Sequence, residues 1–192
     1  MVRGKAMIEY KHPWITPIGQ TSFFTAVQHE KLLDEVMQHP EIMAEIKVGS
    51  LRISDRKKEF PKLASFIENV LKPHAKYFIQ DFYDHRPEDL RWSAWVHACI
   101  NGAGLVPHYH MGDEHMASIL YLTESKANLV LRNPMANMMR NWPQEILKGH
   151  YADVQVNPRV GDFVIFPTFI DHYVMAAEPD FRISIAIDWC FE

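Results

Sequence analysis

The chain has 192 residues, the length of one ordinary domain, and 52 of them are Leu, Ile, Val or Phe. This fraction, about 27%, exceeds the roughly 20% below which a chain is expected to stay disordered, so a packed core is expected. The formal net charge is −4 and the Lys and Arg residues form no run, which argues against the basic stripe of a nucleic-acid-binding protein. We therefore expect a globular protein with no nucleic-acid partner.

The sequence offers no membrane anchor and no disulfide framework. No apolar stretch approaches the ~20 residues of a membrane-spanning helix, and residues 1–5 lead into polar and aromatic sequence instead of an apolar signal core. The two cysteines, Cys99 and Cys190, form no CxxC pair, and their apolar surroundings predict buried free thiols. We expect a cytoplasmic location and no membrane partner.

Residues 1–90 carry helical patterns. Apolar residues recur at helical spacing over 21–37, which predicts a first helix. Pro61 can open a second helical segment, which ends near Pro87. Within that segment Pro73 must kink or split the helix, because proline lacks a backbone donor and clashes with the preceding turn. This half of the chain is predicted to be a helical support for the rest.

Residues 91–192 have the pattern of short strands separated by Gly, Pro and Asn turns, with a Met-rich surface excursion at 135–141. The predicted strands are 92–100, 118–122, 128–131, 154–156, 162–166, 172–175 and 183–189. Many short strands divided by such turns indicate an antiparallel barrel or sandwich. The predicted fold class is therefore mainly β with N-terminal helices, in a single domain covering 1–192.

Histidines stand out in the composition, and three of the eleven lie within 108–115. Residues i and i+2 of a strand point to the same face, so His108 and His110 can present imidazole nitrogens to one ion. A third ligand must then come from elsewhere in the chain. This spacing favours a metal site over isolated structural histidines.

A second segment adds His172 and an arginine. A Gly-Asp turn, an apolar strand and Pro-Thr place His172 at the start of a strand. Ten residues later Arg182 and Ser184 alternate with isoleucines, which puts both on one face. An arginine on the inward face of a barrel is costly unless an anion meets it, and its planar fork suits a carboxylate. A salt bridge to Asp or Glu at the rim is the alternative for Arg182.

Together these motifs resemble the iron(II)/2-oxoglutarate-dependent oxygenases, and most closely the small prolyl-hydroxylase-like proteins of bacteria and phages. The resemblance covers roughly residues 92–189 and rests on HxH, ASILYL, Asn-Pro, PRVGDFVIFPTFIDHYV and RISIAID. It implies a double-stranded β-helix, or jelly roll, with Fe(II) as cofactor and 2-oxoglutarate as co-substrate. It also implies that His108 and His172 bind the metal, while Arg182 and Ser184 bind the far carboxylate of 2-oxoglutarate.

One position departs from the pattern of that family, whose first motif is usually His-x-Asp or His-x-Glu. Here the third residue is His110, so the metal triad is completed by His110, by Asp113 through a looped turn, or by water. Tyr121 and Tyr109 are further candidates to donate a hydrogen bond to the bound carboxylate. His97 and Asn101 flank the turn before HxH and are candidates to line the pocket, and Trp142 is a candidate to cover a substrate. Three tryptophans are predicted to lie in the core: Trp92, Trp95 and Trp189.

The activity implied by the resemblance is oxidative decarboxylation of 2-oxoglutarate with dioxygen, giving succinate and CO2. This reaction would be coupled to hydroxylation of an unactivated C–H bond. Because the sequence carries no basic groove, we expect a small molecule or a peptide side chain as the substrate.

Two other classes remain open at this stage. The spacing of His108, His110 and Glu114 matches the first cupin motif up to its last glycine, where this chain has Tyr121. A cupin-type dioxygenase or isomerase would bind metal with these three residues and His172, but it gives no reason for the Arg-x-Ser pair. A non-catalytic jelly-roll binding protein would keep the barrel without turnover, and the missing His-x-Asp carboxylate favours it. The oxygenase is the preferred interpretation.

Overall fold

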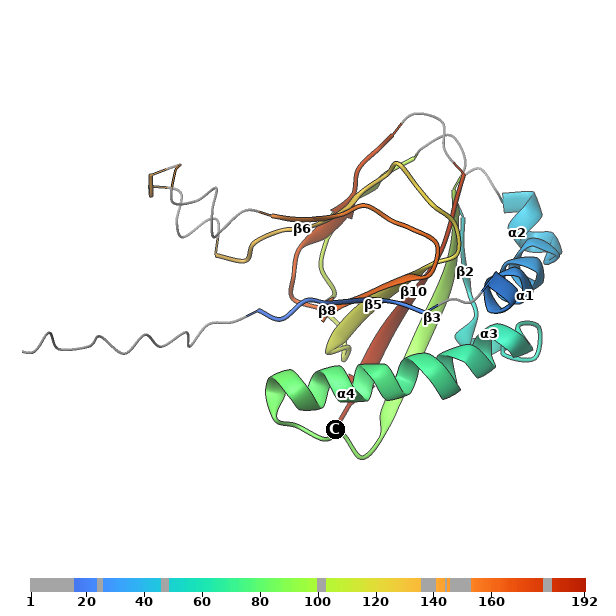
Figure 1. Cartoon of the computed structure of the whole chain (residues 1–192), viewed down its shortest axis with the longest axis horizontal. Coiled ribbons are helices and arrows are strands. Elements are labelled where there is room, and N and C mark those ends of the chain that lie inside the picture. The colour runs from blue at the N-terminus through green and yellow to red at the C-terminus, as the bar shows by residue number, and fades with distance from the viewer. Residues whose placement is uncertain are drawn as a thin grey trace, which may run out of the picture.

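Two antiparallel sheets face each other in this protein, and helices cover the outer face of the larger sheet (Figure 1). The computed structural model describes residues 16–23, 26–45, 49–99, 103–135, 141–143, 145, 153–177 and 181–192. None of the helices in these segments is both long and apolar enough to cross a lipid bilayer.

The strands of the described residues are β1 (Gly19–Ser22), β2 (Gly49–Arg52), β3 (Leu90–Cys99), β4 (Leu105–His108), β5 (Met116–Tyr121), β6 (Leu129–Leu131), β7 (Val154–Val156), β8 (Asp162–Pro167), β9 (His172–Val174) and β10 (Arg182–Phe191). The larger sheet has the order β1-β8-β5-β10-β3-β2, and the smaller sheet has the order β4-β9-β6-β7. All of these pairings are antiparallel. The strands predicted in the second half of the chain are all confirmed, to within a few residues at their ends.

The helices are α1 (Ala26–Met37), α2 (Pro40–Glu45), α3 (Pro61–Phe66) and α4 (Lys72–Tyr83), with a 3-10 turn at Ser54–Arg56 and a π-helical turn at Ile67–Leu71. The π-helical turn joins α3 to α4, and Pro73 lies in the first turn of α4. The helix start predicted at Pro61 is confirmed. The kink or split predicted at Pro73 takes the form of the π-helical turn directly before it, and the residues that flank this turn, Phe66 and Lys72, keep helical backbone angles.

The predicted start of the first helix is wrong. The helix begins at Ala26, and Thr21 and Ser22 instead end β1, which pairs with β8 at the edge of the larger sheet. β2 forms the opposite edge by pairing with β3. β1 is a short polar segment, so its pairing depends on backbone hydrogen bonds and leaves no hydrophobic pattern in the sequence. The first half of the chain thus contributes two edge strands as well as helices.

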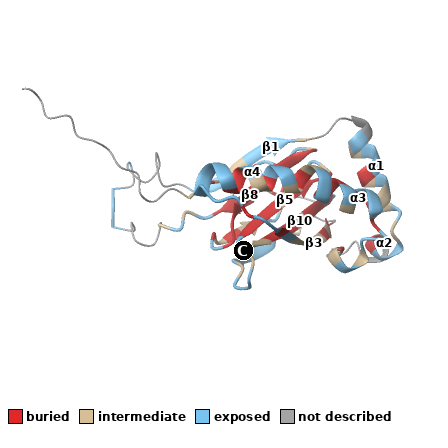
Figure 2. Cartoon of the chain, turned by 90° about the horizontal axis from the view of Figure 1, so that it is seen from below, coloured by how far each residue is buried: buried red, intermediate tan, exposed pale blue. Residues whose placement is uncertain are grey.

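β10 separates the apolar core from the interior of the jelly roll. Its residues Ile183, Ile185 and Ile187 are fully buried and belong to the cluster that the helices form with the larger sheet. Burying a side chain of this size contributes about 1.5–3 kcal/mol. Figure 2 shows buried residues concentrated in the central strands of this sheet, while the outward faces of the helices are exposed. The alternate residues of β10 point to the other face, where the smaller sheet lies.

The cysteines are free, as predicted. Cys99 is buried at the end of β3, and Cys190 is half-buried near the end of β10.

The turn before β8 depends on a glycine with a left-handed backbone. Gly161 has φ 84°, and its N–H donates to the carbonyl oxygen of Tyr121 at 2.9 Å. Gly161→Ala is expected to lower the free energy of unfolding by about 1–2 kcal/mol, because a Cβ is strained at this φ. Gly161→Asn should lower the free energy of unfolding by less, because asparagine tolerates a positive φ better than alanine does. Urea denaturation of the three proteins makes the comparison, and equal stability of Gly161→Ala and wild type would contradict it.

Candidate functional site

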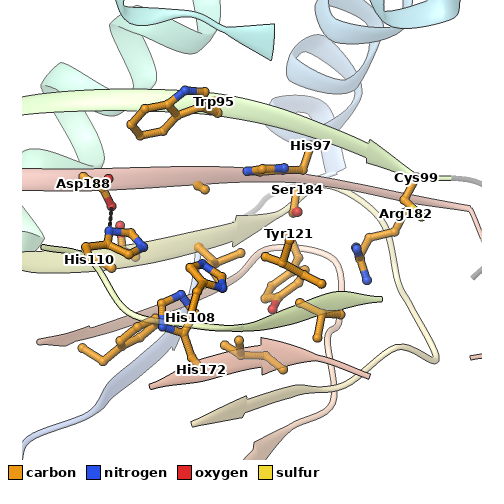
Figure 3. A pocket seen from close by; sticks show the side chains of 18 of the residues that line it. Trp95, His97, Cys99, His108, His110, Tyr121, His172, Arg182, Ser184 and Asp188 are labelled. Carbon is orange, nitrogen blue, oxygen red and sulfur yellow. Dashed lines mark ion pairs between the residues drawn. The ribbon is translucent and has the colours of Figure 1, made fainter. Parts of the chain in front are cut away.

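A cavity of about 530 Å³ lies between the two sheets. The register of the larger sheet arranges one wall, because paired residues on adjacent strands point to the same face. Ser184 on β10 pairs with Tyr121 on β5 and with His97 on β3, so these three residues form one row. Arg182 pairs with Cys99 in the next row. All five residues line the cavity (Figure 3).

Three histidines converge on the other side of the cavity (Figure 3). His108 ends β4 and His172 begins β9, and the two residues are partners in the ladder, with ring centroids 4.2 Å apart. His110 lies beyond the end of β4, in a loop that is held by donation of its N–H to the carbonyl oxygen of Thr168 at 3.2 Å. One ring nitrogen from each histidine lies within 4.8 Å of the other two. The predicted convergence of His108 and His110 occurs, but through a loop and not through a shared strand face.

Backbone carbonyl groups fix the tautomer of two of these imidazoles. His108 Nδ1 lies 2.9 Å from the carbonyl oxygen of Val106, and His172 Nδ1 lies 2.9 Å from that of Ile170. A carbonyl oxygen only accepts, so Nδ1 carries the proton of each neutral ring and Nε2 keeps its lone pair. Burial lowers the pKa of His172 to about 4, so this ring is neutral near physiological pH.

A carboxylate holds the third imidazole. His110 Nδ1 lies 3.1 Å from Oδ1 of Asp188, a buried residue of β10. This hydrogen bond raises the pKa of His110, and burial opposes the rise. With Nδ1 donating to the carboxylate, Nε2 of His110 is again the nitrogen left for a ligand. Three imidazole Nε2 atoms are a donor set that suits iron and other transition metals.

Arg182 carries a buried positive charge, and none of the acidic side chains that the structure describes forms an ion pair with it. Its guanidinium points into the cavity (Figure 3). Nη2 donates a long hydrogen bond of 3.5 Å to the carbonyl oxygen of Ala103. Nη1 is buried and has no hydrogen-bond partner among the described residues. The alternative of a salt bridge to Asp or Glu is not found in the described part of the chain. A guanidinium left in this state costs several kcal/mol, so the geometry fits a site for an anionic ligand.

A family model described as "Putative 2OG-Fe(II) oxygenase" matches residues 93–188. The match spans half of the chain and contains the three histidines, Arg182 and Asp188. This chain belongs to the 2OG-Fe(II) oxygenase family. Membership confirms the predicted family, the dioxygenase class, and the dependence on Fe(II) and 2-oxoglutarate. None of the curated proteins matches the sequence.

Several solved structures resemble this one over most of its length. A prolyl-4-hydroxylase from Pseudomonas putida has 15% sequence identity and a TM-score of 0.65, covering 92% of this chain and 94% of its own. HygX from Streptomyces hygroscopicus, with nickel and 2-oxoglutarate bound, has 12% identity and a TM-score of 0.60, covering 91% and 82%. A prolyl hydroxylase from Trichoplax adhaerens, in complex with a hypoxia inducible factor peptide fragment, has 12% identity and a TM-score of 0.59, covering 91% and 83%. The likeness confirms the predicted double-stranded β-helix.

The structure of this oxygenase does not bring Asp113 to the three histidines. Asp113 is exposed at the bend that follows His110, so its side chain faces solvent, and it is neither in the cavity lining nor in the three-histidine group. Glu114, the fourth ligand that a cupin would use, lines the cavity but also lies outside that group.

The remaining predicted site residues either do not line the cavity or lie outside the described residues. Tyr109 is 56% exposed and Trp142 is 49% exposed, and neither lines the cavity. Asn101 and most of the Met-rich excursion, residues 136–140, are outside the described residues.

Two residues of the oxygenase site were missed or underrated by the sequence reasoning. Trp95 was expected in the core but lines the cavity together with His97. The alternation of Trp95, His97 and Cys99 along β3 is the signal that places them on one face. Asp188 was missed, although the alternation that begins with Arg182 on β10 reaches it.

His97 makes the stability of the metal-free oxygenase depend on pH. Burial, together with the positive charge of Arg182, lowers the pKa of His97 to about 4. Between pH 6.5 and about 4 the unfolded chain therefore binds a proton that the folded protein does not. The free energy of unfolding should decrease as pH falls through this window, by up to about 1.4 kcal/mol per pH unit for this group.

The test compares urea denaturation of wild type and His97→Gln across this pH window. His97→Gln should show a shallower loss of stability on acidification, while the same substitution at His85, which is exposed, serves as the control. Parallel pH profiles for wild type and His97→Gln would contradict the assignment.

Proposed function

We propose that this oxygenase couples oxidative decarboxylation of 2-oxoglutarate by dioxygen to hydroxylation of a C–H bond. The observation that carries the proposal is a single cavity with three imidazole rings on one side and the buried guanidinium of Arg182 on the other. One nitrogen of each ring lies within 4.8 Å of the other two. A dicarboxylate anchored at Arg182 can present its keto-acid end to a metal at the histidines, because both groups line the same cavity.

His108, His110 and His172 would hold the iron through their Nε2 atoms. The fit rests on the donor chemistry, because all three Nδ1 atoms already have acceptors and the three rings approach one another. When bound, the iron supplies the site at which 2-oxoglutarate and dioxygen react. The hydrogen bonds at the three Nδ1 atoms fix the orientation of the rings, so that little reorganisation is needed when the metal enters.

Arg182, Ser184 and Tyr121 would bind the far carboxylate of 2-oxoglutarate. A guanidinium can hold a carboxylate through two parallel hydrogen bonds, which would satisfy Nη1, an atom with no hydrogen-bond partner in the described segments. Burial raises the pKa of Tyr121, so its phenol stays protonated and can donate a third hydrogen bond. Ser184 lies beside Tyr121 in the register and can donate from its hydroxyl.

The substrate that we propose is a small molecule or a peptide side chain that brings an apolar group to the iron. Trp95, Leu105 and Met111 line the cavity, and Met111 is 82% exposed. The peptide complex of the Trichoplax adhaerens relative supports a peptide as one source of such a group. The family match favours the oxygenase over the cupin-type and non-catalytic alternatives. A cytoplasmic location remains a prediction from the sequence.

Succinate formation tests the proposed function. Purified protein is incubated in air with Fe(II) and 2-oxoglutarate, and succinate is measured with and without candidate substrates. We expect slow succinate formation that requires both additions, and faster formation when a substrate is present. Protein that binds iron and 2-oxoglutarate but forms no succinate under any of these conditions would contradict the proposal.

A further inference from the structure

Asp188 is a buried acid in the wall of the cavity. It is 7% exposed and lies on the inward face of β10, the same face as Arg182 and Ser184. Its register partners on the neighbouring strands, Ala117 and Ser93, carry no charge. Among the ion pairs of the described residues, His110 is the one partner of Asp188. Burying a carboxylate with a single imidazole partner is costly, so the presence of Asp188 in the cavity wall calls for a function.

The three histidines differ in how their rings are held. His108 and His172 each use the carbonyl group two residues earlier in their own segment. His110 lies in the loop after β4, where it has no such carbonyl contact, and its Nδ1 bonds to a side chain of β10 instead. β10 is a central strand, paired with β3 and β5 on its two sides. Asp188 therefore connects a ligand in a loop to a rigid part of the fold.

The charges of the three-histidine group also indicate a function for Asp188. Three neutral imidazoles contribute no negative charge, so a bound dication would keep its full charge against the wall of the cavity. Asp188 places a carboxylate one hydrogen bond beyond this ligand set. A carboxylate in that position both orients the ring and makes its Nε2 a better donor.

We propose that Asp188 supplies, through His110, the carboxylate that the metal ligand set of this oxygenase lacks. It is a positioning residue: it fixes the His110 ring with Nε2 toward the metal and offsets part of the metal charge. The inference rests on the proposed function, because it assigns the metal to the three histidines.

Affinity for Co(II) alone, followed by visible absorption without 2-oxoglutarate, provides the test. Asp188→Asn removes the charge but keeps the size and an acceptor oxygen, and it should weaken Co(II) binding by about 10–100-fold. Asp188→Ala should weaken it at least as much, because the orienting hydrogen bond is lost as well. Asp113→Asn is the matched control, since Asp113 is the nearby exposed acid, and it should bind Co(II) like wild type.

A double-mutant cycle separates positioning from general damage. In the His110→Asp background a carboxylate is in the ligand set itself, and Asp188 has no imidazole to orient. Adding Asp188→Asn to that background should then cause no further loss of Co(II) affinity. An equal loss in both backgrounds would overturn the proposal, because it would mean that Asp188 acts on the fold and not through His110.

The outcomes keep this inference distinct from the proposed function. Wild type that binds no Co(II) would overturn both. If Asp188→Asn binds Co(II) as tightly as wild type, the role of Asp188 alone is overturned. If Asp113→Asn loses Co(II) affinity instead, the role belongs to Asp113. Circular dichroism checks the fold of each variant. If Asp188→Asn does not fold, Asp188→Ser is measured in its place, since a serine side chain fits between Ala117 and Ser93.

Discussion

Arg182→Ala is expected to weaken the binding of 2-oxoglutarate by about 30-fold or more while leaving metal affinity unchanged. Truncating one partner of a buried, hydrogen-bonded charge pair costs about 2–5 kcal/mol, and each 1.4 kcal/mol is about tenfold in affinity. Titration of 2-oxoglutarate into the metal-loaded protein measures the effect. Arg182→Lys should recover part of the affinity, because an ammonium keeps the charge but not the planar fork.

The control for this prediction is Arg132→Ala, which removes an exposed arginine that is paired with Asp171. It should bind 2-oxoglutarate like wild type. Arg182→Met should also leave the protein without 2-oxoglutarate at least as stable as wild type, because it removes a buried guanidinium whose Nη1 has no partner among the residues that the structure describes. An unchanged affinity in Arg182→Ala, or a large loss of stability in Arg182→Met, would contradict an anion-binding role.

His172→Ala is the second change with a large expected effect, and it should nearly abolish metal binding. It removes one of three ligands, so the loss should exceed the roughly 10–100-fold that outer-sphere partners produce. His108→Ala should behave in the same way, because these two residues face each other in the ladder. Isothermal titration with Co(II) measures both variants.

His115→Ala is the matched control for the histidine series, since His115 is exposed and its ring packs on Phe191. It should bind Co(II) like wild type. His110→Ala completes the series by testing which residue supplies the third ligand. We expect Co(II) affinity to fall strongly in His110→Ala and to stay unchanged in Asp113→Ala. The reverse result would mean that the loop after β4 rearranges to bring Asp113 to the metal.

The sequence predicts the central strands well because each of them carries its own signal. The alternation of Arg182 and Ser184 with isoleucines reflects a strand that has helices on one face and the cavity on the other. β1 and β2 have no such signal, because these short edge strands are defined by partners far away in the chain. For the same reason the start of the first helix was placed within β1.

Part of the candidate site could likewise be predicted from the sequence, and part depends on the fold. The approach of His108, His110 and His172 to one another could be predicted, because imidazole spacing is itself informative. His108 and His110 were expected to lie on one strand face, but β4 ends at His108 and His110 approaches the other two histidines from the loop that follows. That displacement also explains why Asp188 was missed: its importance depends on how His110 is held, which only the folded chain determines. Trp95 was taken for a core residue because a tryptophan that lines a cavity and one that fills a core look alike in a strand.

The most direct test of the central claim is an anaerobic titration of the metal-free protein with Fe(II) and then with 2-oxoglutarate, followed by visible absorption. We predict a weak charge-transfer band that requires both additions and does not form in Arg182→Ala at the same 2-oxoglutarate concentration. Iron binding without a band would contradict the use of 2-oxoglutarate at this site. Absence of iron binding would contradict the metal centre itself, and would leave His108, His110 and His172 as structural residues.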